Sequence, residues 1–410
     1  MLCATAVHVS LLLLAALCAA ETTRHVYHQP LDHFAPGGGG GTVPQTYFVN
    51  SDHFNGGPVI LYSVGERGAQ ATDIEDSLVY DMARQTQAVV VLLEQRFYGA
   101  SQPNGPDQLQ FLSVEQMMGD IYRFATLANV TGDGRTRRPW VLVGGSFAGS
   151  LAAWTGHAYP ALGAMVVASS APMRLVDGYW GFDEAAAQRI PCAPALSQAV
   201  RRIDRELDSG DDMRVRTIKR LFGLSPAQSA EELAGVLTVR LAELAPSPVG
   251  PAADEEIGDF CHELSSGPPA VALARITRGL VGGPRATAEC PGGDERAWLW
   301  LQCTQIGLWQ TAPPVADRVR FAHRLRSRRL TVAYFDGVCR RCFPGFRPRR
   351  QEFRGFADRA RRAYEGDTRS AVFSVGELDP WRPLAVGGAW VIAGAAHAQD
   401  LQLNDEEAPP

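Results

Sequence analysis

The chain has 410 residues, of which 46% are hydrophobic and 20% charged, and its formal net charge is −5. This composition is that of a folded globular protein and excludes disordered, collagen-like and coiled-coil chains. No long stretch collects Lys or Arg, which argues against a nucleic-acid partner. Since single cores stop growing near roughly 250–300 residues, the length predicts either two or three domains or one large domain with an insertion.

The first 20 residues have the pattern of a secretory signal peptide. An apolar run at 11–18 is followed by Ala19 and Ala20 and then by polar residues. The run is too short to span a bilayer, which needs about 20 apolar residues. An uncleaved anchor is the alternative, since no Lys or Arg precedes the run. We expect cleavage after residue 20, delivery to the secretory pathway with an extracellular or lysosomal destination, and no stable membrane insertion.

Six cysteines lie beyond this leader: Cys192, Cys261, Cys290, Cys303, Cys339 and Cys342. In an oxidising compartment they predict up to three disulfides, with fifteen pairings open. Two of them, Cys339 and Cys342, have the spacing of a zinc or redox site, but no second pair of this kind accompanies them. Structural disulfides are therefore favoured, and neither a metal nor a cofactor is expected. Asn129 begins an Asn-Val-Thr sequon and is a candidate glycosylation site.

Short apolar runs bounded by glycine and proline predict buried parallel strands at 59–64, 88–93, 140–143, 164–168, 371–375 and 390–393. Helical patterns at 75–86, 113–127 and 149–157 alternate with the first four runs, which predicts an α/β sheet with crossover helices. Helical patterns with little strand signal fill residues 179–328. The expected organisation is a signal peptide (1–20), a first core part (21–178), a helical cap insertion (179–328) and a second core part (329–410).

A candidate nucleophile lies at Ser146. The strand at 140–143 runs directly into residues 144–149, Gly-Gly-Ser-Phe-Ala-Gly, and a helical pattern follows. A strand, a tight turn with serine at its apex and a helix form a nucleophile elbow. An ordinary glycine-rich turn is the alternative, because Ala148 stands where the usual pattern has glycine. In such an elbow the backbone N–H of Phe147 faces the developing oxyanion.

Chain order selects the acid and the base. In an α/β-hydrolase the acid follows a later strand and the histidine follows the last one. Asp379 follows the strand at 371–375, and His397 follows the strand at 390–393. We therefore predict that His397 acts as general base and acid for Ser146 and that Asp379 orients it. The second oxyanion donor is expected in the loop after the first core strand, at Gly65.

With these residues placed, the chain resembles the serine peptidase family of lysosomal Pro-Xaa carboxypeptidase, dipeptidyl peptidase II and thymus-specific serine protease, and most closely the thymus-specific branch. The segments that carry the resemblance are 93–99 (Leu-Glu-Gln-Arg-Phe-Tyr-Gly), 144–154, 169–172 (Ser-Ser-Ala-Pro), 303–305 (Cys-Thr-Gln), 376–381 and 396–401. The resemblance implies an α/β-hydrolase with an inserted, disulfide-stapled helical cap over the site. It also implies that Ser146, Asp379 and His397 match the family triad.

The same resemblance implies a serine exopeptidase that hydrolyses peptides, often after proline. Whether the peptide is shortened at its carboxyl or its amino end stays open, because a free ammonium group requires a carboxylate and a free carboxylate requires arginine or backbone donors. Glu66, Arg67 and Trp381 are the candidate substrate-binding residues. A homodimer also stays open.

Three positions depart from the family pattern: Phe147 stands for tyrosine, Gln95 for histidine and Gln305 for glutamate. Together with the short C-terminus, Phe147 and Gln305 leave a second class of function open: a catalytically silent binding protein with the same fold. An esterase is the other alternative, since a serine triad hydrolyses esters as readily as amides.

Overall fold

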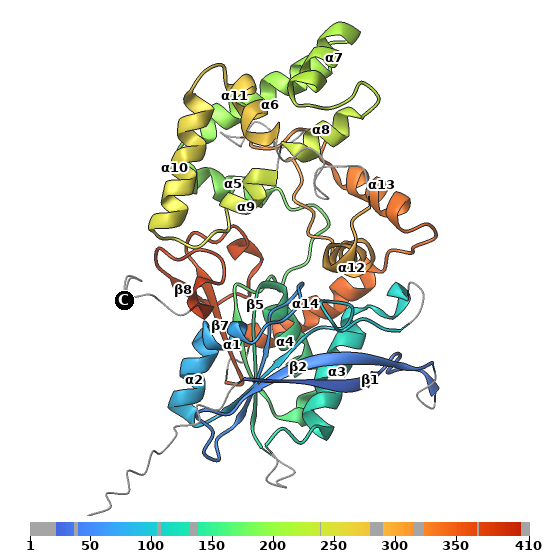
Figure 1. Ribbon diagram of the computed structural model, residues 1–410, viewed down its shortest axis with the longest axis vertical. Coiled ribbons are helices and arrows are strands. Elements are labelled where there is room, and N and C mark those ends of the chain that lie inside the picture. The colour runs from blue at the N-terminus through green and yellow to red at the C-terminus, as the bar shows by residue number, and fades with distance from the viewer. Residues whose placement is uncertain are drawn as a thin grey trace, which may run out of the picture.

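The computed structural model describes residues 22–36, 40–104, 108–131, 138–237, 239–278, 290–314, 324–366 and 369–402. The predicted signal peptide lies outside the described residues. In Figure 1 a twisted sheet with its helices forms the lower part of the molecule, and a group of helices lies above it. None of the helices in the described ranges has the length and apolar character needed to cross a membrane.

The sheet has eight strands in the order β1-β2-β4-β3-β5-β6-β7-β8. Six of them run parallel: β3 (Val59–Ser63), β4 (Val89–Leu93), β5 (Trp140–Gly145), β6 (Met165–Ser169), β7 (Ala371–Gly376) and β8 (Trp390–Ile392). These strands fall on the predicted apolar runs and confirm the α/β class. Two further strands, β1 (Thr23–Pro30) and β2 (Thr42–Asn50), form an antiparallel pair at one edge.

Both faces of the sheet are buried. Successive side chains of a strand point to opposite faces, so neighbouring residues of one strand belong to different cores. Val59 and Leu61 of β3 belong to the core shared with α3 (Val114–Leu127), α4 (Ser146–Ala158) and α14 (Arg350–Gly366), whereas Ile60 belongs to the core shared with α1 (Thr72–Glu75) and α2 (Leu78–Thr86). Crossover helices therefore cover both faces, as the strand–helix alternation predicts. Asn129 is exposed just beyond α3, and its glycosylation stays a prediction.

Between β6 and β7 the chain forms the helices drawn above the sheet in Figure 1, which we call the cap: α5 (Gly181–Arg189), α6 (Ala193–Leu207), α7 (Asp212–Leu221), α8 (Ala230–Val236), α9 (Val239–Leu244), α10 (Pro251–Ser265), α11 (Pro269–Thr277), α12 (Gly293–Leu301) and α13 (Val332–Cys342). Shorter 3-10 turns cover Leu109–Phe111, Pro160–Leu162, Arg382–Leu384 and Gln399–Leu401, and a π-helical turn covers Gln302–Ile306.

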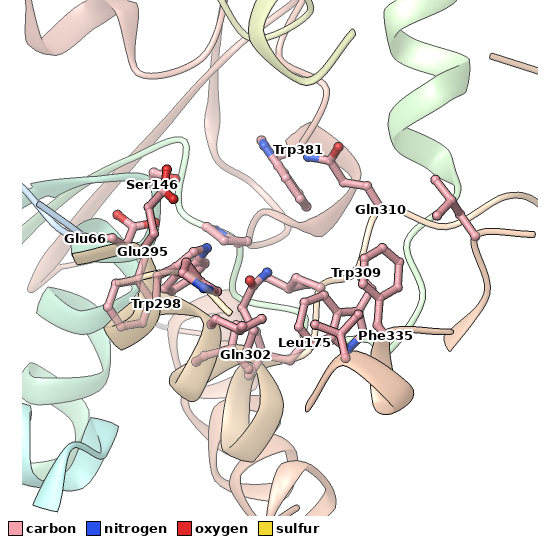
Figure 2. Close-up of a pocket in the computed structure, with 18 of the residues that line it drawn as sticks. Glu66, Ser146, Leu175, Glu295, Trp298, Gln302, Trp309, Gln310, Phe335 and Trp381 are labelled. Atoms are coloured by element: carbon pink, nitrogen blue, oxygen red, sulfur yellow. The ribbon is translucent and has the colours of Figure 1, made fainter. Parts of the chain in front are cut away.

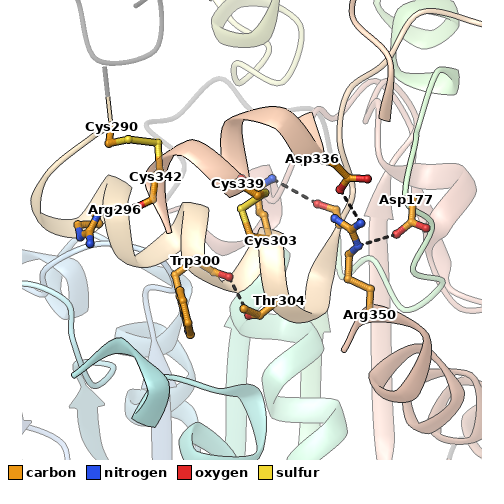
Figure 3. The surroundings of a disulfide bond; sticks show 12 residues. Asp177, Cys290, Arg296, Trp300, Cys303, Thr304, Asp336, Cys339, Cys342 and Arg350 are labelled. Carbon is orange, nitrogen blue, oxygen red and sulfur yellow. Dashed lines mark hydrogen bonds and ion pairs between the residues drawn. A yellow bond between two sulfur atoms is a disulfide. The ribbon is translucent and has the colours of Figure 1, made fainter. Parts of the chain in front are cut away.

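Three disulfides join cap elements that are distant in sequence. Cys192 at the start of α6 is bonded to Cys261 of α10. The other two bonds, Cys290–Cys342 and Cys303–Cys339, join the two flanks of α12 to α13 (Figure 3). The six predicted cysteines are thus all bonded, and Cys339 and Cys342 each pair with a distant cysteine instead of with each other.

One arginine ties the cap to the second part of the core. Arg350, at the start of α14, lies 2.6 Å from Asp336 of α13 and 3.2 Å from Asp177, which belongs to the segment that leaves β6 (Figure 3). Its side chain is only 10% exposed, so these ion pairs are shielded from solvent. The chain segments that lead into and out of the cap are therefore joined through the Arg350 side chain.

Candidate active site

Ser146 occupies a strained turn at the carboxyl edge of the sheet. Strand β5 ends at Gly145, α4 begins at Ser146, and the Ser146 φ angle is +54°, a value that residues with a side chain seldom adopt. A Cβ added to Gly144 would lie 2.5 Å from the Ala148 carbonyl carbon, and one added to Gly149 would lie 2.7 Å from the Gly144 oxygen. The tight turn therefore requires glycine at both positions, which explains the pattern read from the sequence.

Asp379 and His397 are hydrogen-bonded to each other. The His397 Nδ1 atom lies 2.9 Å from Asp379 Oδ1, and the same oxygen accepts the Trp381 N–H at 2.8 Å. The Asp379 side chain is fully buried, whereas that of His397 is 15% exposed. Because Nδ1 donates to the carboxylate, Nε2 is the ring nitrogen available to take a proton. The two residues follow β7 and β8, as the chain order predicts.

The loop that carries His397 packs against the turn that carries Ser146. The Ala398 N–H donates to the Ser170 hydroxyl at 2.8 Å, and a Cβ added to Gly145 would lie 3.2 Å from the Ala398 Cβ. Ala398 follows His397 directly, and Gly145 precedes Ser146. The fold thus brings together, at one edge of the sheet, two segments that the sequence separates by more than 200 residues.

The loop after β3 lies against the start of α4. Gly65 has φ +82°, and a Cβ there would be 3.7 Å from the Ala148 Cβ. The Gly65 N–H donates to the Ser63 hydroxyl at 3.3 Å. On the other side, the Phe147 ring is buried against Trp154 and Trp298, while its N–H belongs to the first turn of α4, where a helix has no internal acceptor.

Two carboxylates that sequence reasoning missed hold this loop in place. Glu94 accepts the Ala69 N–H at 2.8 Å and the Ala100 N–H at 2.9 Å. Asp294, in the first turn of α12, accepts the N–H groups of Gly68 and Gly99, both at 2.9 Å. Glu94 lies in a segment that carries the family resemblance and could have been singled out. No sequence pattern indicates the role of Asp294, because the two glycines it contacts lie 226 and 195 residues away in the sequence.

A cavity of about 460 Å³ opens beside Ser146 between the core and the cap (Figure 2). Its walls include the aromatic side chains of Trp154, Trp298, Trp309, Tyr334, Phe335 and Trp381 and the polar or charged side chains of Glu66, Glu295, Gln302, Gln310 and Arg326. Trp381 stacks on Tyr179 with ring centroids 5.3 Å apart. Of the predicted substrate-binding residues, Glu66 and Trp381 line this cavity, whereas Arg67 lines a smaller one of about 320 Å³ that also contains Ser146.

Burial shapes the charge of the site. It raises the pKa of the Glu66 carboxyl above its usual range, while the residue's own N–H and the nearby His397 and Arg67 act in the opposite direction. The Arg67 guanidinium pairs with Asp73 at 2.5 Å. Within the described ranges, His, Cys, Asp and Glu side chains form no group of three or more that could hold a metal ion.

The strand order, the crossover helices on both faces and the strand–turn–helix unit at Ser146 define an α/β-hydrolase. The family profile described as serine carboxypeptidase S28 matches residues 29–232 and 277–410, which is most of the chain. The chain therefore belongs to this family of serine peptidases, and the resemblance read from the sequence is confirmed.

Individual relatives are distant. Serine protease vicPb of Bipolaris victoriae is 24% identical over 93% of this chain and 85% of that protein. Human thymus-specific serine protease is 28% identical over 65% of this chain and 60% of its own length, and mouse lysosomal Pro-X carboxypeptidase is 32% identical over 37% of this chain and 32% of its own. Among solved structures, proline iminopeptidase of Mycobacterium smegmatis aligns with a TM-score of 0.36 at 12% identity, over 91% of each chain.

Proposed function

We propose that this protein is a serine exopeptidase of the secretory pathway in which Ser146, Asp379 and His397 form the catalytic triad. The observation that carries the proposal is the buried Asp379–His397 hydrogen bond beside the strained turn at Ser146. Membership of a serine peptidase family supports it. One relative is called lysosomal Pro-X carboxypeptidase, and on that likeness we extend the proposal to a preference for cleavage after proline.

In this mechanism Ser146 Oγ attacks the peptide carbonyl carbon while its proton passes to His397 Nε2. Asp379 keeps the ring in the required tautomer and stabilises the imidazolium that forms. The Phe147 N–H and a second donor from the loop after β3, predicted at Gly65, stabilise the oxyanion. His397 then gives the proton to the leaving amine, and water hydrolyses the acyl-enzyme by the same steps.

The cavity supports the peptide substrate and the exopeptidase mode. Cap helix α12 supplies Trp298, and α13 supplies Phe335, so the cap walls the space above Ser146. A site covered by a cap admits a chain terminus or a short peptide more easily than the middle of a long chain. The aromatic walls suit an apolar ring such as that of proline, which stacks on aromatic faces without losing a hydrogen bond.

The proposal is tested by mass spectrometry of proline-containing peptides incubated with wild-type protein and with Ser146→Ala. We expect stepwise shortening by the wild type and a loss of turnover on the order of 10⁶ in the variant. Hydrolysis of simple esters without any peptide cleavage would instead favour the esterase. A folded wild type that leaves both substrate classes intact would favour the silent binding protein.

A further inference from the structure

Gln95 is a buried polar side chain that the proposed mechanism does not use. It follows β4, its exposed fraction is 0%, and its amide nitrogen donates to the Ser63 hydroxyl oxygen at 2.8 Å. Its amide oxygen has no hydrogen-bond partner among the residues that the structure describes. A buried amide with an unmet hydrogen bond destabilises a fold relative to an apolar side chain of the same shape. Packing alone therefore does not explain a glutamine at this position.

Ser63 connects this amide to the loop beside the nucleophile. It is the last residue of β3, where it pairs with Gly144 of β5, and it lines the smaller cavity that contains Ser146. Its hydroxyl oxygen also accepts the Gly65 N–H at 3.3 Å. Because a hydroxyl oxygen has two lone pairs, the donors from Gln95 and Gly65 together fix its orientation.

The segment that carries Gln95 is itself held by buried hydrogen bonds. The following residue, Arg96, is also 0% exposed and donates to both carboxylate oxygens of Asp120, at 2.6 Å and 2.5 Å. The preceding residue, Glu94, accepts the Ala69 N–H at 2.8 Å. Two consecutive residues thus hold the two ends of the loop after β3, Glu94 directly and Gln95 through the serine hydroxyl.

We propose that Gln95 is a positioning residue of the active site: through Ser63 it fixes the backbone at Gly65, where the second oxyanion donor is expected. The inference rests on the proposed function and assigns a role to a residue that departs from the family pattern. Gly65 lies against the first turn of α4, so release of its N–H would let the loop shift relative to Ser146. Because the oxyanion forms only after attack, loss of the contact should lower kcat and leave KM nearly unchanged.

The test compares the steady-state kinetics of wild type, Gln95→Met, Ser63→Ala and the double variant on a peptide that wild type cleaves. Methionine keeps an unbranched side chain of similar length but donates no hydrogen bond. We expect each single variant to lower kcat by roughly 10- to 100-fold, because a displacement of about 1 Å near the reacting atoms can cost up to 10²-fold. The double variant should match Ser63→Ala, since the amide has nothing to position once the hydroxyl is gone.

Thermal unfolding separates positioning from a purely structural role. Because Gln95→Met removes an amide oxygen that has no partner among the described residues, we expect its melting temperature to equal or exceed that of wild type. Gln29→Met is the matched control. Gln29 is also 0% exposed, but it lies in β1 at the far edge of the sheet and donates to Gln45 at 2.9 Å. Its loss should lower the melting temperature and leave kcat unchanged.

Three results would overturn the inference while leaving the serine peptidase intact. The first is an unchanged kcat in Gln95→Met. The second is an equal loss of kcat in Gln29→Met. The third is a double variant in which the losses of the two single variants multiply, because independent residues behave in this way. If folded wild type cleaves no peptide, the proposed function fails and the inference falls with it.

Discussion

At the scale of single residues, Gln305 explains one departure from the family pattern. Its amide oxygen accepts the Val114 N–H at 2.8 Å, and its amide nitrogen donates to Glu115 at 2.7 Å. A glutamate at this position would keep the first contact but would place a second carboxylate against Glu115. The glutamine therefore joins the cap to the start of α3, and its neutral side chain fits that contact. Phe147 likewise serves packing, since its ring contacts Trp298 of the cap.

Glu66 makes stability depend on pH. Because burial raises its pKa above the ordinary value of 4.5, the folded protein holds the proton more tightly than the unfolded chain does. The ionised carboxylate thus destabilises the fold. Its effect on the free energy of unfolding is absent below pH 4.5, and it grows as the pH rises to the raised pKa. We expect Glu66→Gln to be more stable than wild type at pH 7, with the gain vanishing near pH 4.

Denaturant unfolding across this pH range measures the effect, with Glu255→Gln as the control for loss of an exposed carboxylate. A gain that is equal at pH 4 and pH 7 would contradict burial as its cause, because linkage requires the difference to follow ionisation.

At the scale of elements, the loop after β8 is held from two sides. Asp400 accepts hydrogen bonds from the hydroxyl groups of Ser169 in β6 and Ser374 in β7. Gln399 donates to the Val249 carbonyl at 2.8 Å and accepts the Val249 N–H at 3.0 Å, so it joins the loop to the cap segment between α9 and α10. The Gln399 oxygen also accepts the Ala396 N–H, which precedes His397.

We therefore expect Gln399 to be a positioning residue for His397. Gln399→Ala should lower kcat by about tenfold with little change in KM, because a displacement of about 1 Å at a reacting group can cost up to 10²-fold. Steady-state kinetics measure the effects on kcat and KM separately. Gln198→Ala, at an exposed glutamine of α6, is the matched control. A lower melting temperature with unchanged kcat would mean that Gln399 only stabilises the fold.

At the scale of the whole molecule, the sequence predicts the parallel strands because each is a continuous apolar run. It does not reveal β1 and β2, whose inward positions include polar residues such as Gln29 and Gln45, hydrogen-bonded to each other at 2.9 Å. Chain order was enough to place Ser146, Asp379 and His397 at strand ends. The sequence does not indicate the roles of Glu295, Asp294 and Gln399, because their positions depend on how the cap packs on the core. The cysteine pairing depends on the same packing.

The cap is part of the site in this arrangement. Through Asp294 it holds the loop that follows β3, and through Val249 it holds the loop of His397. It also supplies Glu295 and Trp298 to the cavity. Since the loops on both sides of Ser146 are fixed by cap residues, we expect chemistry and substrate selection to depend on the same packed interface.

The proposed activity depends on Ser146 being a nucleophile activated by His397. The most direct measurement is reaction of the mature protein with a serine-directed fluorophosphonate, followed by peptide mass spectrometry. We predict a single adduct on Ser146, absent from Ser146→Ala and slowed by several orders of magnitude in His397→Ala. An unlabelled Ser146 in folded wild-type protein, or labelling at the same rate in His397→Ala, would contradict this role.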